Sequence, residues 1–371
     1  MEHFKTHKEW MAPDTPSEKG YADYPTITQR CPGLALLATI VSRKASDRLG
    51  VFQGKAFMRI VRVLGVGLGL LALLTLGSLV AVWAPDRSAE DLATRWAGPP
   101  SEFVWVDGMK VHLRDEGPRD DPQPILLLHG TSSSLHTWDG WANVLKEKHR
   151  VIRVDLPGFG LTGPTPDASY LMPVYSHFIA SLMDRLKVKQ AVLAGNSLGG
   201  YVAWKTAVDY PERVSKLILV DAAGYATTAT SVPLGFKLAQ MPMLSGLMAN
   251  ILPRRVIESS LRNVYGDPSK ITAELVDRYY ELSLRAGNRR ALPARFAQNK
   301  AGEFEAQITQ IRQPTLLIWG GLDRLIPPEN AQKFHRDIAN SRVVMFDTLG
   351  HVGHEEDPVA TVAAVQEFLD R

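Results

Sequence analysis

The chain has little cysteine and no strong imbalance of charge. Cys31 is the only cysteine among 371 residues, so neither an internal disulfide nor a cysteine-ligated metal cluster can form. The formal net charge is only +3, and residues 1–62 carry ten Lys and Arg against six Asp and Glu. Since the remainder is close to neutral, the composition gives no support to a nucleic-acid partner. We expect no bound metal and no cofactor.

Charge is absent from one long apolar segment. Residues 63–85 contain no charged side chain, and a helix of this length crosses a hydrocarbon core of about 30 Å. We therefore predict a transmembrane signal anchor over residues 58–85. Basic residues precede the segment and acidic residues follow it: Arg43, Lys44, Arg48, Lys55, Arg59 and Arg62, then Asp86, Glu90 and Asp91. The positive-inside rule places the N-terminus in the cytoplasm and the rest on the translocated side, which is the periplasm in a bacterium.

A cleaved signal peptide is the alternative interpretation of the same segment. The stretch "MRIVRVLGV" from Met58 is similar to a basic n-region, and Met58 could be the true start of the protein. Against cleavage, the best small-residue site ends at Ala84 and is followed by Pro85. The apolar run is also long for a signal peptide, so we favour the uncleaved anchor.

The segments on either side of the anchor have their own patterns. Residues 1–57, with few large apolar side chains in the first thirty, predict a disordered cytoplasmic tail. Ser88 precedes Asp91 by three residues, which is typical of a helix N-terminus, and the following "GPP" ends the helix. We expect residues 86–100 to form a stalk that holds the remaining chain near the membrane surface.

From residue 101 onward, apolar strand patterns alternate with helical patterns. The strand patterns cover residues 103–106, 109–117, 124–130, 150–160, 191–197, 216–224, 315–321 and 342–347. The helical patterns cover residues 174–186, 198–209, 329–338 and 358–369. Unalternated runs such as "ILLL" and "LILV" are typical of parallel strands buried on both faces. This alternation predicts an α/β fold with a doubly wound, mostly parallel sheet.

One long interruption breaks the alternation. Residues 225–308 carry only helical patterning, which predicts a helical lid inserted between a first core segment, 101–224, and a second, 309–371. The first part of the lid includes three methionines, Met241, Met243 and Met248. Such soft side chains suit either ordinary packing between lid and sheet or an adaptable pocket for an acyl chain.

The stretch "GNSLG" at residues 195–199 fits the pattern G-x-S-x-G. A buried strand precedes it and a helix follows it, which is the context that this motif requires. The turn between the two elements is sharp, and glycines on either side of the serine relieve the crowding. Ser197 is therefore expected to project its hydroxyl above the sheet at a helix N-terminus, as a nucleophile.

A serine hydroxyl needs a base to take its proton and a carboxylate to orient that base. In this kind of fold the acid and then the histidine each follow a later strand. Asp323 and His351 meet that expectation, with Asp221 as the reserve acid. His354 competes with His351 as the base. We prefer His351 because it is nearer the strand end and directly follows Gly350.

Residues 101–371 resemble the α/β-hydrolase superfamily. The resemblance lies in "LLLHG", "DLPGFGLT", "AGNSLGG", "IWGGLDRLIPP" and "GHVGHEEDP", which occur in the order that the superfamily has. It implies that the catalytic histidine is the one in "GH" seven residues before a proline. That spacing holds for His351 and Pro358 and leaves His354 as a neighbour.

The same resemblance implies an oxyanion hole. The residue after "HG", Thr131, and the residue after the nucleophile, Leu198, would each supply a backbone N–H to it. Such donors stabilise the charge that develops on the carbonyl oxygen of the substrate, and losing one costs about 100- to 1000-fold in rate. We expect structural roles for His129 and for Asp155 in "DLPGFG".

The predicted nucleophile narrows the reaction. A serine disfavours the haloalkane dehalogenase and epoxide hydrolase branches, which attack with a carboxylate. We predict a serine hydrolase that cleaves lipophilic carboxylic esters through an acyl-enzyme, because the anchor and the methionine-containing lid favour apolar substrates. Hydrolases that cleave carbon–carbon bonds in ring-fission products are the alternative, since they are similar at "GNS", although Val352 stands where they usually have tryptophan. A non-catalytic binding module is the remote alternative.

Overall fold

The computed structural model describes residues 32–241 and 250–371. The contacts divide the chain into two compact units, Met1–Leu76 and Gly77–Arg371. Helix α1, Pro32–Val82, contains the stretch Phe57–Ser78, whose 22 residues have a mean hydropathy of 2.2. Among the described residues this is the one helix long and apolar enough to cross a membrane.

Helix α1 corrects one prediction from the sequence. Disorder was expected up to residue 57, but the helix already begins at Pro32. The stretch "LALLATIVSRKA" that opens it is rich in Leu, Ala, Lys and Arg, which are good helix formers. The scarcity of apolar residues holds only for the first thirty positions. The remainder of the predicted tail, residues 1–31, lies outside the described residues.

The second unit contains an eight-stranded sheet, as the sequence predicts. Its strands are β1 Ser101–Val106, β2 Met109–Glu116, β3 Ile125–Leu128, β4 Val151–Val154, β5 Ala191–Asn196, β6 Val214–Val220, β7 Thr315–Gly320 and β8 Ser341–Phe346. They lie in the order β1-β2-β4-β3-β5-β6-β7-β8. Strands β3 to β8 are all parallel to one another. Strand β2 pairs antiparallel with both β1 and β4.

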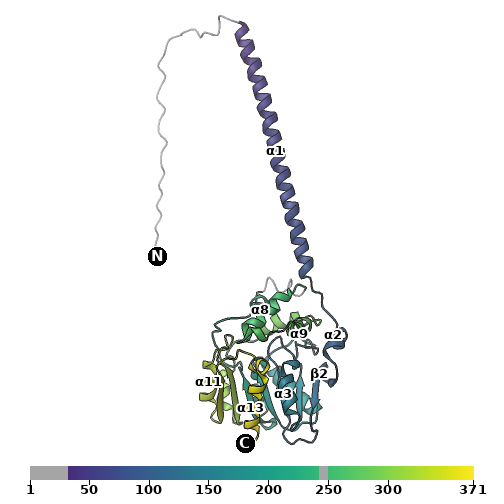
Figure 1. The fold of residues 1–371 in the computed structure, drawn as a ribbon, viewed down its shortest axis with the longest axis vertical. Helices are drawn as coiled ribbons and strands as arrows, with labels where there is room; N and C mark the ends of the chain where they lie inside the picture. The colour runs from purple at the N-terminus through teal and green to yellow at the C-terminus, as the bar shows by residue number, and fades with distance from the viewer. Residues whose placement is uncertain (1–31, 242–249) are drawn as a thin grey trace, which may run out of the picture. The chain divides into compact units, whose positions relative to one another are not determined.

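Helices cover both faces of the sheet. They are η2 Leu135–Trp138, α3 Asp139–Leu145, α4 Met172–Arg185, α5 Leu198–Asp209, η3 Pro211–Arg213, α11 Glu329–Asp337, α12 Gly353–Glu356 and α13 Pro358–Leu369. Side chains of α4, α5 and α11 share one buried cluster with the sheet, and side chains of α3 and α13 share another. Helices α3 and α13 pack on the same face (Figure 1). The fold is therefore doubly wound, as predicted.

The long interruption between β6 and β7 is helical. It contains α6 Leu234–Ala239, α8 Arg254–Val264, η4 Pro268–Lys270, α9 Ala273–Ser283, α10 Asn288–Gln298 and η5 Glu305–Gln310. Helices α8 and α9 lie together at one end of the sheet (Figure 1). Of the three methionines considered in the sequence, Met241 is half exposed. Met243 and Met248 lie outside the described residues.

The segment expected to form a stalk contains a capped helix. Helix α2, Ala89–Trp96, begins where predicted, and the Ser88 hydroxyl accepts a hydrogen bond of 3.0 Å from the Asp91 backbone N–H. However, the indole of Trp96 donates a hydrogen bond of 2.7 Å to Glu281 on α9. Leu92 is fully buried. The segment expected to form a stalk therefore packs against α9 within the second unit.

The residues just before α2 also dock onto the lid. The Ala84 N–H donates to the Asn250 carbonyl at 2.9 Å, and the Arg87 N–H donates to the Leu284 carbonyl at 2.7 Å. Between them, the Asp86 carboxylate forms an ion pair of 2.6 Å with Arg289 on α10. These bonds hold residues 84–87 against the lid within the second unit.

Candidate active site

Ser197 occupies a strained turn between β5 and α5. Its φ is +55° and its ψ is −114°, a conformation that side chains rarely adopt. A Cβ at Gly195 would lie 2.2 Å from the Gly199 carbonyl oxygen, and one at Gly199 would lie 2.0 Å from the Leu128 carbonyl oxygen. Only glycine fits at both positions, which explains the motif physically.

Backbone hydrogen bonds hold this turn in place. The Ser197 N–H donates to the Val220 carbonyl of β6 at 3.0 Å. The Ser197 carbonyl accepts from the N–H groups of Tyr201 and Ala223, both at 3.0 Å. The strained conformation is thus fixed from β6 and from α5, which orients the hydroxyl before any substrate binds.

His351 and Asp323 form a buried pair. The imidazole Nδ1 of His351 donates to the Asp323 carboxylate at 2.7 Å, and each residue is 4% exposed. The other carboxylate oxygen accepts from the backbone N–H groups of Leu325 at 2.8 Å and Ile326 at 3.0 Å. A proton held on Nδ1 leaves Nε2 with a lone pair, which is the form that can accept a proton.

The loop that carries His351 is tied to the nucleophile turn. The Asn196 side-chain amide donates to the His351 carbonyl at 2.9 Å, while the His351 N–H donates to the Val264 carbonyl at 2.7 Å. Asn196 was not predicted as a functional residue. Its position next to Ser197 was the feature of the sequence that could have indicated this role. Within the described residues no hydrogen bond joins Ser197 to His351, although both line one cavity. Such bonds often tighten only when substrate is present.

Asp221, the reserve acid, lies behind the pair. It is fully buried, and its carboxyl accepts a hydrogen bond of 2.8 Å from the Gly320 N–H. Burial and the neighbouring Asp323 raise the pKa of Asp221 well above its ordinary value. The structure places Asp323 and not Asp221 against His351.

His354, the competing base, is packed in a different environment. It is fully buried, with its ring 4.0 Å from the ring of Trp138 and its Nε2 hydrogen-bonded to the Thr137 hydroxyl at 3.1 Å. Burial, and then the charge of His351, hold the pKa of His354 well below its usual value. His354 is not among the residues lining the cavity at Ser197.

The two predicted oxyanion donors flank the nucleophile. Thr131 lines the same cavity as Ser197, and Leu198 begins α5. A Cβ at Gly130 would lie 3.3 Å from the Ser197 Cβ, so the loop before Thr131 lies against the nucleophile turn. Neither backbone N–H donates to a group within residues 32–241 and 250–371, so both can receive a ligand's oxygen.

His129 and Asp155 hold the surrounding loops, as the sequence predicted. His129 donates from Nδ1 to the Gly130 carbonyl at 2.7 Å and accepts at Nε2 from the Leu156 N–H at 2.9 Å. The Asp155 carboxylate accepts from two backbone N–H groups, those of Leu135 at 2.7 Å and Leu161 at 2.8 Å. Neither residue has a free polar atom directed to a substrate.

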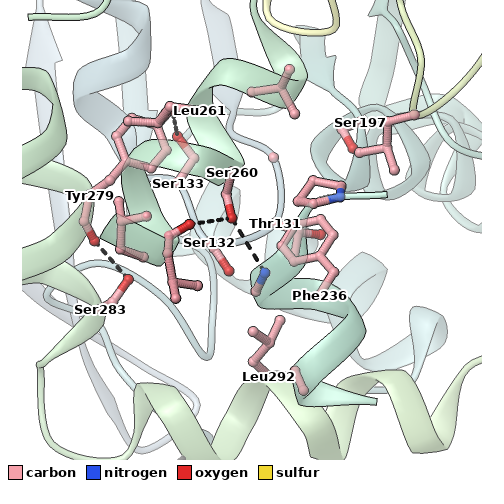
Figure 2. Close-up of a pocket in the computed structure, with 18 of the residues that line it drawn as sticks. Thr131, Ser132, Ser133, Ser197, Phe236, Ser260, Leu261, Tyr279, Ser283 and Leu292 are labelled. Carbon is pink, nitrogen blue, oxygen red and sulfur yellow. Dashed lines mark hydrogen bonds between the residues drawn. The ribbon is translucent and has the colours of Figure 1, made fainter. Parts of the chain in front are cut away.

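A cavity of about 130 Å³ opens onto Ser197 beneath the lid (Figure 2). Its apolar wall comes mostly from the lid: Phe236, Leu252, Val256, Ile257, Leu261 and Leu292. The one charged lid residue in the lining, Arg289, is paired with Asp86. No carboxylate lines this cavity among the described residues. The arrangement can hold an apolar chain with its reacting end at the serine.

No group of three or more His, Cys, Asp or Glu side chains is placed to hold a metal ion in the described part of the chain. The chemistry that the described side chains can perform is nucleophilic attack by Ser197, with proton transfer through His351 and charge stabilisation at the two backbone donors.

Comparisons with known proteins identify the fold family. A family model described as the alpha/beta hydrolase fold matches residues 123–358. The uncharacterized hydrolase YugF of Bacillus subtilis is 29% identical over 274 residues, covering 73% of this chain and 98% of YugF. The 2-hydroxymuconate semialdehyde hydrolase of Pseudomonas sp. strain CF600 is 28% identical, covering 71% and 91%. The solved structure of a bacterial membrane phospholipase A aligns with a TM-score of 0.64 at 26% identity, covering 85% of this chain and 98% of that one.

Proposed function

Because the chain belongs to the α/β-hydrolase fold family, we propose that it is a serine hydrolase that cleaves lipophilic carboxylic esters through an acyl-enzyme. The observation that carries this proposal is the apolar cavity under the lid, which opens onto Ser197. A cavity with an apolar wall gains free energy by taking up the hydrocarbon part of a substrate, at about 25 cal/mol per Å² buried. The ester of such a substrate would then lie at the nucleophile.

The positions of the side chains support the following reaction. The Ser197 oxygen attacks the ester carbonyl while His351 takes the hydroxyl proton, and Asp323 stabilises the resulting imidazolium. The N–H groups of Thr131 and Leu198 bind the oxyanion. The acyl carbon–oxygen bond breaks, the alcohol leaves with the proton from His351, and the acyl group remains on Ser197. Water, activated by His351, then releases the acid.

We also propose that α1 anchors the enzyme in a membrane, with the catalytic unit on the translocated side. The apolar stretch Phe57–Ser78 and the basic residues before it support this proposal. The similarity to a membrane phospholipase A, which extends over 85% of this chain, adds support. An anchored enzyme has direct access to esters that partition into the bilayer.

Cleavage of carbon–carbon bonds in ring-fission products is the second candidate. The relatives named for 2-hydroxymuconate semialdehyde and 2-hydroxy-6-oxo-2,4-heptadienoate hydrolysis, each 28% identical, favour it. We rank it second because Val352 follows the histidine and because the cavity wall is apolar.

One experiment separates the two candidates. The full-length chain in mild detergent is assayed with p-nitrophenyl esters of graded acyl length and with a ring-fission dienoate. We expect turnover of the esters to exceed that of the dienoate by at least about tenfold in kcat/KM, and labelling of Ser197 by a fluorophosphonate. Turnover of the dienoate with little or no ester cleavage would make the enzyme a carbon–carbon hydrolase.

A further inference from the structure

A second hollow adjoins the lid cavity and also reaches Ser197. This open cleft of about 1150 Å³ shares Ser197, Thr131, Phe236, Ala239, Pro293 and Leu325 with the lid cavity, and it extends along α5, the residues after β6 and α10. An ester has two arms, acyl and alcohol. Since the lid cavity suits the acyl arm, the open cleft is left for the alcohol.

The open cleft contains a buried cation that lacks an acidic partner. Arg295, on α10, is 9% exposed, and its Nη2 donates to the Thr131 hydroxyl at 3.1 Å. Its guanidinium carbon lies 4.6 Å from the centre of the Phe296 ring. Its Nε is buried without a hydrogen-bond partner, and no carboxylate of the described residues forms an ion pair with it.

A buried arginine in this state is unusual, since removing a charge from water is costly unless it is paired. Burial lowers the pKa of Arg295, and among its described neighbours only Tyr175 opposes that shift. The guanidinium nevertheless stays charged near pH 7. The missing partner must then come from a ligand if the charge is to be compensated.

Two further donors line the same cleft. Tyr201 is buried in the lining, and Lys300 is exposed at the rim. No Asp or Glu of the described residues lines this cleft. Glu303 lies near Lys300 and Tyr201, whereas Arg295 has no ion pair with a described carboxylate. Arg295 can therefore bind an oxyanion group, to which arginine can donate two hydrogen bonds at once.

We propose that the alcohol arm of the substrate carries a phosphate, which binds Arg295 in the open cleft, so that the preferred esters are acylglycerol phosphates. This inference rests on the proposed ester hydrolysis and specifies its substrate class. Hydrolysis breaks the acyl carbon–oxygen bond. The fatty acid and the glycerol phosphate are the products, and the alcohol oxygen takes its proton from His351.

The test compares octanoylglycerol 3-phosphate with octanoylglycerol below their critical micelle concentrations, using the full-length chain in detergent. We expect a higher kcat/KM for the phosphate ester, and a loss of about 10- to 100-fold for that ester alone in Arg295→Met. Arg295→Lys should retain part of the preference. Arg290→Met is the matched control, because Arg290 is an exposed arginine on the same helix and lines neither hollow.

The outcomes are distinguishable. If the wild type cleaves octanoylglycerol and p-nitrophenyl esters but shows no preference for the phosphate ester, this inference fails while ester hydrolysis stands. An equal loss on both esters in Arg295→Met would make Arg295 a support for the Thr131 loop and would also overturn it. If no ester is cleaved, the proposed function fails together with this inference.

Two further experiments test the proposal. Lys300→Gln, at an exposed position that should not disturb folding, is expected to raise KM for the phosphate ester only, and melting curves check that Arg295→Met is folded. Inorganic phosphate, compared with chloride at equal ionic strength, should compete with the phosphate ester in the wild type but not in Arg295→Met. If phosphate inhibited hydrolysis of the neutral ester and the enzyme showed no preference for the phosphate ester, the cleft would be a site for free anions. That result would contradict the proposal.

Discussion

The His351 imidazole donates through Nδ1 to the Asp323 carboxylate at 2.7 Å, in a site where both side chains are almost completely buried. Asp323→Asn would place an amide where the carboxylate accepts that proton. The imidazole would then hold its proton on Nε2, where it cannot accept one from Ser197. We expect kcat for ester hydrolysis to fall by about 10⁴-fold with little change in secondary structure, measured by stopped assay and circular dichroism.

Asp221→Asn is the matched control, since this buried carboxyl lies behind the pair and His351 bonds to Asp323 instead. Its pKa is raised by burial and by Asp323, so the stability that its protonated form contributes is lost as the pH rises above about 3.9, where an unfolded Asp ionises. Asp221→Asn does not lose stability in this way. Its free energy of unfolding, compared with that of the wild type, should therefore be higher at pH 7 than at pH 4. Activity should stay within a few-fold. A 100-fold loss in Asp221→Asn would transfer the acid role to Asp221.

The two histidines of the last loop should behave differently. His351→Ala is expected to lower kcat as much as loss of the nucleophile, because the two groups act as a unit. His354→Ala should keep most of its activity per folded molecule but unfold at a lower temperature, because it removes a ring packed on Trp138. Kinetics and melting curves of both variants check this. Inactivity confined to His354→Ala would mean that the base is misplaced.

The lid cavity should set the acyl chain length. Leu292 projects into it from α10 (Figure 2). Leu292→Trp should move the optimum of a p-nitrophenyl ester series to shorter chains, and Leu292→Ala should move it to longer ones, because the cavity loses or gains volume. Val359→Trp, at a position 76% exposed on α13, is the control and should leave the optimum unchanged. If neither Leu292 variant shifted the optimum, the acyl chain would have to bind elsewhere.

The membrane anchor can be tested by truncation. Full-length protein should sediment with membranes and resist carbonate extraction. Deletion of residues 1–82 should release a soluble, active enzyme that still has the docked segment with Ala84 and Asp86. Deletion of residues 1–87 should lower the melting temperature, because the bonds of that segment to the lid are lost. Recovery of full-length protein as a soluble species with a new N-terminus near Pro85 would instead support a cleaved signal peptide.

Local patterns in the sequence were sufficient for the sheet and the nucleophile turn. The runs of apolar residues predicted all eight strands, and the glycines around Ser197 predicted its turn, because each depends on neighbours in the chain. The docking of α2 was not predictable in this way, since Trp96 bonds to Glu281, which is distant in sequence. The same holds for Asn196 and Arg295, whose partners His351 and Thr131 only the fold brings near.

Helix α1 shows a different limit of local patterns. The low apolar content of the first thirty residues led to a prediction of disorder up to residue 57. However, the stretch from Pro32 onward is made of good helix formers. The raised pKa of Asp221 could not be predicted from the sequence either. It depends on complete burial beside a second carboxylate, which is a property of the folded chain.

The central claim is that the Ser197 hydroxyl forms an acyl-enzyme with the substrate. The most direct measurement is intact-mass spectrometry of the full-length chain mixed rapidly with a slowly hydrolysed p-nitrophenyl ester, followed by peptide mapping. The account predicts a mass increase of one acyl group on the peptide that contains Ser197, none in Ser197→Ala, and a loss of turnover of roughly a million-fold in that variant. An acyl adduct that persists in Ser197→Ala, or turnover that survives the substitution, would contradict the account.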